Sequence, residues 1–213
     1  MSVALDHLVF AARSLAEGTA WLTERLGCPP AGGGAHPLMG THNSLWRTGD
    51  AYLEVICVDP EAPPPGRPRW YALDDPATAA RMARGPILHH WVVQVPDLAA
   101  ARAGAAPDPG PALRVTRDAL HWDLTVPDDG GLHFGGAYPT LIQWPEGVQT
   151  PPARMPDQGL GLERLTVYGP PALRAGLETV GATALINWQE AEVPGFAAEI
   201  ATPRGPVRFS TAP

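Results

Sequence analysis

The chain has few cysteines, no run of basic residues and no long apolar segment, and each of these features removes a class of function. Cys28 and Cys57 are its only two cysteines and do not have the close spacing of a zinc site, so we expect two free thiols in a reducing compartment. A net charge of −7 without any basic cluster argues against a nucleic-acid partner. No window approaches ~18 consecutive apolar residues and no secretory leader is visible, so we expect a cytoplasmic protein without a membrane span.

The composition is typical of a globular protein. Of 213 residues, 45% are hydrophobic and 17% are charged, which is enough to build a sizeable core. The 26 prolines and 23 glycines gather in connections such as residues 60–69 and 103–112, and therefore mark loops between ordered segments.

A pattern that occurs twice is the most informative feature of the sequence. LDHLVF carries His7 at its third position, and LHHWVV carries His90 at its third position. An Ala-rich helical stretch follows each of them, and each unit closes with a strand that holds one polar residue, Glu54 in YLEVI and Gln143 in TLIQW. A repeat of this kind predicts duplicated supersecondary units that share one core.

The expected elements have the same order in both copies. Residues 3–10 and 51–58 are predicted strands of the first copy, and a helix begins after the N-cap Ser14 and ends at Gly27. A third, weaker copy follows Asp157, where Arg164 occupies the histidine position. We therefore predict an α+β chain with these parts: a first βαβββ unit (1–60), a linker with a short helix (61–86), a second βαβββ unit (87–148) and a C-terminal βαββ(β) extension (157–213).

Alternation along the strands indicates which side chains face one another. His7 is expected to share a face with Leu5 and Val9, because successive side chains point to opposite faces. His89 and His90 must likewise point apart, and the repeat selects His90 for the interior. A carboxylate within the apolar strand of Glu54 is costly to bury without a partner.

Two imidazoles, a carboxylate and an amide oxygen predict a divalent metal site, with Zn, Ni, Mn or Fe as candidates. The predicted ligands are His7, Glu54, His90 and Gln143. Ordinary burial is the alternative for each of them, since a lone histidine is more typical of a core and an amide can be satisfied by hydrogen bonds. Residues 69–84 are interpreted as a solvated connection, with a lid over the pocket as the alternative.

The sequence resembles the glyoxalase-like branch of the vicinal oxygen chelate superfamily over residues 3–148. The resemblance lies in LDHLVF, in the stretch GGGAHPLMGTHNSLWRTGDAYLEVICVDP, in HHWVVQV and in LIQW. It implies that the paired units form a half-open, barrel-like sheet around the metal, with ligands on the first and last strand of each unit. Gln143 departs from the glutamate usual there, and a shift of one residue would put Ile142 in register. The stretch GxHPxMGTHN is also similar to the family, and the resemblance implies that His36, His42 and Asn43 lie at the cavity mouth. Trp122 is expected to line the pocket.

The resemblance also implies a function. The expected protein is a metal-dependent isomerase or lyase that stabilises an enediolate-like intermediate, with Glu54 as the proton shuttle. An Fe(II) ring-cleaving dioxygenase and a metal-free protein that sequesters small molecules are the alternatives. The expected partner is a small-molecule substrate, and a homodimer is possible.

Overall fold

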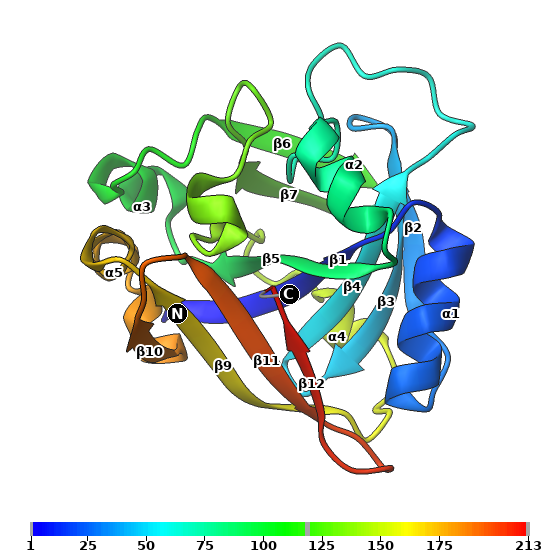
Figure 1. Cartoon of the computed structure of the whole chain (residues 1–213). Helices are drawn as coiled ribbons and strands as arrows, with labels where there is room; N and C mark the ends of the chain where they lie inside the picture. The colour runs from blue at the N-terminus through cyan, green and yellow to red at the C-terminus, as the bar shows by residue number, and fades with distance from the viewer. Residues whose placement is uncertain (1, 118–119, 212–213) are drawn as a thin grey trace.

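The computed structural model describes residues 2–117 and 120–211, in which three units of related design follow one another (Figure 1). The first unit comprises β1 (Ala4–Ala11), α1 (Leu15–Leu26), β2 (Gly32–His36), β3 (Thr41–Thr48) and β4 (Ala51–Val58). After α2 (Pro76–Met82), the second comprises β5 (Ile87–Gln94), α3 (Leu98–Gly104), β6 (Ala112–Arg117), β7 (Leu120–Thr125), η1 (His133–Gly136) and β8 (Thr140–Gln143). After α4 (Pro151–Arg154), the third comprises β9 (Gly161–Gly169), α5 (Pro171–Thr179), η2 (Ala182–Leu185), β10 (Asn187–Glu190), β11 (Gly195–Ala201) and β12 (Val207–Ser210).

Helix α1 has the termini that its sequence predicts. The Ser14 hydroxyl accepts a hydrogen bond from the Glu17 backbone N–H, which satisfies one of the free donors of the first turn. Gly27 ends the helix with a left-handed backbone (φ 80°), a conformation that glycine adopts without steric cost. The helix lies against β4 on the outside of the large sheet (Figure 1).

The first two units build one eight-stranded sheet with the order β2-β3-β4-β1-β5-β8-β7-β6. Each half has the same pairing, because β1 is parallel to β4, β5 is parallel to β8, and β1 and β5 meet antiparallel at the centre. The outer strands β2 and β6 lie against each other, so the sheet is nearly closed into a barrel. The predicted paired βαβββ architecture is confirmed.

Two bulges interrupt the pairing of β1 with β5. Leu5 pairs with Val93 but His7 pairs with Val92, which leaves Asp6 as an extra residue in β1. A bulge of this kind turns the side chains that precede it relative to those that follow. Leu5 consequently packs in the outer core while Val9 belongs to the inner one, so the prediction that His7 shares a face with both is wrong for Leu5.

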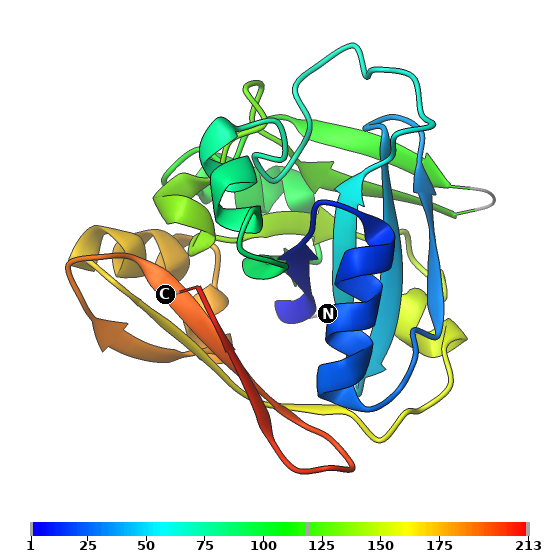
Figure 2. The ribbon, with the colours of Figure 1, turned by 45° about the vertical axis from the view of Figure 1, so that its right-hand side comes forward.

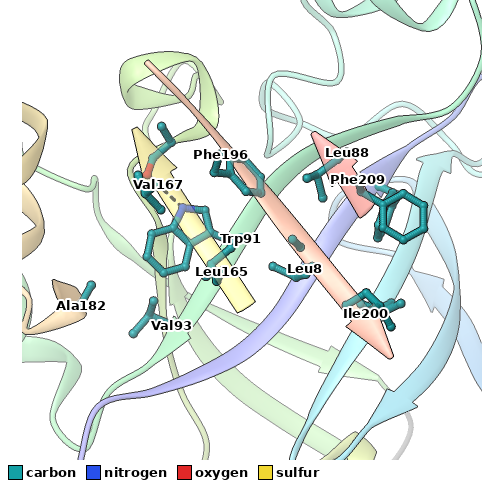
Figure 3. Close-up of a cluster of buried hydrophobic side chains, with 14 of the residues drawn as sticks. Leu8, Leu88, Trp91, Val93, Leu165, Val167, Ala182, Phe196, Ile200 and Phe209 are labelled. Atoms are coloured by element: carbon teal, nitrogen blue, oxygen red, sulfur yellow. Dashed lines mark hydrogen bonds between the residues drawn. The ribbon is translucent and has the colours of Figure 1, made fainter. Parts of the chain in front are cut away.

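The third unit forms a separate four-stranded sheet with the order β10-β9-β11-β12. This sheet crosses the outside of β1 and β5 (Figures 1 and 2). Figure 3 shows the contact, in which Leu8 and Trp91 of the barrel meet Val167, Phe196 and Ile200 of the second sheet in one buried hydrophobic cluster. The outer faces of β1 and β5 are thereby shielded from water, which explains why both strands are buried on both faces over most of their length. None of the described helices is long and apolar enough to cross a membrane.

Candidate functional site

A small cavity of about 30 Å³ lies inside the barrel, roughly the space that one or two water molecules need. Side chains from both halves of the sheet and from the connection before α2 line it. The lining comprises His7, His36, Asn43, Tyr52, Glu54, Trp70, Tyr71, Arg117, Trp122, Leu124, Ile142, Trp144 and Pro151.

A chain of three buried ionisable groups runs along one wall of this cavity. His7 Nδ1 donates to Asp6 Oδ1 over 2.6 Å, and His7 Nε2 lies 3.4 Å from Glu54 Oε2. The second oxygen of Asp6 accepts the indole N–H of Trp144 over 2.7 Å. Asp6, His7 and Glu54 are each only 4% exposed. Asp6 reaches the imidazole because the bulge in β1 turns its side chain toward the interior, a contact that simple alternation did not predict.

Glu54 and His7 hold each other in their charged forms. Burial alone would raise the pKa of Glu54, but the hydrogen bond and charge of His7 and the Asn43 amide outweigh it and lower the pKa to about 2. Burial alone would lower the pKa of His7, but its bonds to Asp6 and Glu54 outweigh it and raise the pKa to about 9. At neutral pH the wall therefore carries the Glu54 carboxylate beside the His7 imidazolium.

Asn43 and His36 form a second, neutral layer beside Glu54. Asn43 Nδ2 donates to Glu54 Oε1 over 2.6 Å and lies 3.3 Å from His36 Nε2, which can accept from it. His36 Nδ1 then donates to the Thr41 hydroxyl over 3.1 Å. Burial lowers the pKa of His36 to about 4, so its ring is uncharged at neutral pH. The layer fixes the Glu54 carboxylate without neutralising it.

The connection before α2 covers the cavity. Trp70 and Tyr71 stack on each other with ring centres 5.4 Å apart, and they are only 3% and 4% exposed. Tyr71 and Ala72 have left-handed backbones (φ 57° and 50°), which are unfavourable for residues with a Cβ. The interpretation of this segment as a solvated connection is therefore wrong at these two aromatic residues, and the lid alternative describes them.

The structure brings His7 and Glu54 together but engages His90 and Gln143 elsewhere. His90 Nδ1 donates to the Gly136 carbonyl, and its Nε2 accepts the Thr140 backbone N–H over 3.1 Å. Gln143 Oε1 accepts the Leu98 backbone N–H over 2.8 Å. Alternation along β8 puts Ile142, rather than Gln143, on the cavity wall.

These positions decide how far the residues fit a divalent metal. His7 Nε2 and Glu54 Oε2 form a pair of donors at the cavity, but Ile142 offers no lone pair and His90 has no free ring nitrogen. Across the described ranges 2–117 and 120–211, no group of three or more His, Cys, Asp or Glu is arranged to hold a metal. The predicted four-ligand set is not assembled in this arrangement.

Three of the four predicted pocket residues line the cavity, namely His36, Asn43 and Trp122. His42 does not, and lies 3.9 Å from Asp59 at the other face of β3. The sequence analysis missed Asp6, Trp70, Tyr71 and Arg117 as site residues. Adjacency to His7 was a usable signal for Asp6, whereas the others come from segments that only the tertiary fold brings to the barrel.

Several solved structures resemble the chain. A hypothetical protein from Staphylococcus aureus aligns with a TM-score of 0.56 and 14% identity, over 99% of this chain and 85% of that one, which shows a shared fold. Methylmalonyl-CoA epimerase from Mycobacterium tuberculosis aligns with a TM-score of 0.43 and 17% identity, over 66% and 87% of the two chains. A hypothetical protein from Bacillus halodurans aligns with a TM-score of 0.45 and 15% identity, over 70% of this chain and 99% of that one.

No curated protein matches the sequence. The profile of the glyoxalase-like domain family, in contrast, matches residues 5–181, which span both halves of the barrel and the start of the third unit. The resemblance seen in the sequence is thereby confirmed, and the chain belongs to the glyoxalase-like domain family.

Proposed function

We propose that the chain is an isomerase- or lyase-type enzyme that moves a proton on a small, oxygen-rich substrate inside the barrel. The observation that carries this proposal is the buried chain Asp6–His7–Glu54, of which His7 and Glu54 line an aromatic-lined cavity. Burying charged groups such as His7 and Glu54 is expensive unless they are paired, and such clusters in cavities are concentrated at catalytic sites. Membership in the glyoxalase-like family supports a small-molecule enzyme or binding protein as the class of function.

Glu54 is the base in this proposal. Its carboxylate is ionised at neutral pH and faces the cavity, so it can accept a proton from a carbon next to a carbonyl group. The distance of 3.4 Å between Glu54 and His7 Nε2 is longer than an ordinary hydrogen bond, so this N–H is held loosely.

His7 is the electrophile. A substrate oxygen that accepts the Nε2–H of the imidazolium removes a donor from Glu54, and so raises the basicity of Glu54 when the proton must be accepted. The same N–H stabilises the negative charge that develops on the substrate oxygen. Asp6 holds the ring through Nδ1, and Trp144 holds Asp6, so the imidazolium is oriented before substrate binds.

Proton exchange in D₂O tests this proposal. A panel of small 2-oxoaldehydes and 2-hydroxycarbonyl compounds is followed by proton NMR for enzyme-dependent loss of the exchangeable C–H signal. We expect Glu54→Gln to lower the exchange rate by about 10²–10⁴-fold, the usual contribution of a positioned base. Glu199→Gln, on β11 away from the cavity, is the matched control and keeps the wild-type rate.

A metal-free binding protein is the second candidate, because five aromatic rings surround the cavity. These are Tyr52, Trp70, Tyr71, Trp122 and Trp144. A saturable change in tryptophan fluorescence with a ligand of the panel, without any exchange or turnover, would favour this candidate over the enzyme.

A further inference from the structure

A second hollow, of about 260 Å³, adjoins the barrel cavity between β2, the end of β6 and α4. Arg117 and Pro151 line both the hollow and the cavity, so these two residues form the border between them. Arg154, the last residue of α4, lines the hollow but not the cavity. The hollow and the cavity are therefore neighbouring spaces, with the Arg117 side chain in the wall of both.

The charge of this hollow is opposite to that of the whole chain. The protein has a net charge of −7 and contains no lysine, so its 15 cationic side chains other than histidine are all arginines. Two of them line the hollow, and its described lining includes no acidic residue. The arginines that pair with carboxylates among the described residues are others: Arg13, Arg69, Arg114, Arg164 and Arg174.

Neighbouring groups hold Arg117 in place, and no ion pair joins it to a carboxylate of residues 2–117 or 120–211. Its side chain lies over the backbone of Gly34, where an added Cβ would come within 3.1 Å of Cδ and 3.3 Å of Nη1. Nη1 is 3.5 Å from Asn43 Oδ1, and the guanidinium carbon is 5.8 Å from the centre of the Trp122 ring. A guanidinium that neighbours position on three sides loses little entropy when it binds a ligand.

The cavity wall adds another unused donor. The indole N–H of Trp70 is buried and has no hydrogen-bond partner among the described residues. Buried donors normally have acceptors, so an unpaired one beside a cavity suggests that a ligand oxygen supplies the acceptor. His7 Nε2–H and the guanidinium of Arg117 offer donors to the same space.

We infer that the hollow binds an oxyanion group, a carboxylate or a phosphate, of the molecule whose other end enters the barrel cavity. Arg117 donates two parallel N–H bonds to this group, a geometry that matches both anions, and Arg154 adds a second positive charge. The statement that this molecule is the substrate rests on the proposed function, whereas the anion site itself does not. An anion site in this position narrows the substrate class to small oxygen-containing anions.

Calorimetric titration with oxalate, inorganic phosphate and the uncharged oxamide tests this inference. We expect saturable binding of oxalate or phosphate, the tighter of the two identifying the natural group, and at least tenfold weaker binding of oxamide. Arg117→Gln should weaken the binding of the preferred anion at least tenfold and Arg154→Gln about threefold. Arg174→Gln removes one exposed positive charge from α5 and should leave the affinity unchanged.

Gly34→Ala provides a milder variant, because its methyl group pushes against the Arg117 side chain while the guanidinium remains. It should give an affinity between those of wild type and Arg117→Gln. Absence of saturable binding of both anions, or equal weakening by Arg117→Gln and Arg174→Gln, overturns the inference. Glu54→Gln should retain the anion affinity while losing proton exchange, so failure of the anion site and failure of the proposed reaction give different results.

Discussion

The two halves of the barrel have the same strand order and the same kind of bulge, but the extra residue of the bulge differs in identity and in hydrogen-bond partner. In β1 the extra residue is Asp6, whose carboxylate turns inward and binds His7. In β5 the extra residue is His89, whose Nε2 donates to the Tyr71 carbonyl over 2.6 Å. A duplicated framework has thus placed a charged cluster in one half and neutral, structural histidines in the other.

The different protonation of the histidines predicts the largest effect. Burial lowers the pKa of His36 and His89 to about 4 and of His90 to about 3, whereas the pKa of His7 is raised to about 9. The first three rings remain neutral when folded but take up protons when unfolded below pH 6.5, so stability falls as the pH drops from 6.5 toward 4. His7 acts in the opposite direction, since its contribution is complete below pH 6.5 and is lost as the pH rises through 9.

We therefore expect maximal stability near pH 6.5, with a steeper loss on the acid side, where three histidines contribute, than on the alkaline side, where His7 alone contributes. Glu54, with its pKa lowered to about 2, adds a loss below pH 4.5. Urea denaturation across the pH range measures both slopes. His89→Asn should reduce the acid slope by about a third, and an unchanged slope would contradict the assignment of His89 as a buried neutral ring.

Replacing the histidine of each half should separate chemistry from stability. His7→Gln removes the imidazolium from the cavity and should lower proton exchange by about 10²–10⁴-fold. His90→Gln disturbs the bonds to Thr140 and Gly136 and should lower the free energy of unfolding by about 1–3 kcal/mol, with little change in the exchange rate. Equal losses of exchange in both folded variants would mean that the two halves share the chemistry.

A new carboxylate in the second half should make the halves more alike. Ile142→Glu puts a third donor on the wall that His7 and Glu54 already line. Without metal, the buried charge should cost about 3 kcal/mol of stability, and Zn²⁺ or Ni²⁺ should restore it as a rise in Tm. Ile142→Gln is the control with equal size and no charge. If metal raises the Tm of wild type as much as that of Ile142→Glu, the second half already supplies the missing donors.

Much of the framework could be predicted from the sequence. The repeat around His7 and His90 correctly indicated two equivalent units, and Ser14 and Gly27 marked the ends of α1 because capping depends on local backbone geometry. The convergence of His7 and Glu54 followed from their positions on neighbouring strands.

The rest of the site depends on features that lack a local signal. A bulge changes which face a residue occupies, so strict alternation put Asp6 on the wrong side of β1. In β8, only four residues long, the same rule turns Gln143 outward once Ile142 is inside. Trp70 and Tyr71 belong to a proline-rich connection whose path over the barrel is set by long-range contacts such as the bond of Ala72 to Gly130.

The backbone of Tyr71 and Ala72 has a consequence for how quickly a ligand can enter the barrel. Two adjacent left-handed residues store about 1–3 kcal/mol each, and the Ala72–Gly130 and His89–Tyr71 hydrogen bonds hold them in place. Movement of the two aromatic rings away from the barrel would relieve this strain, which offsets part of the cost of exposing them to water. Because the cavity has room for only one or two water molecules, a larger ligand can enter only when this short segment moves, so we expect entry to be slow for bulky ligands.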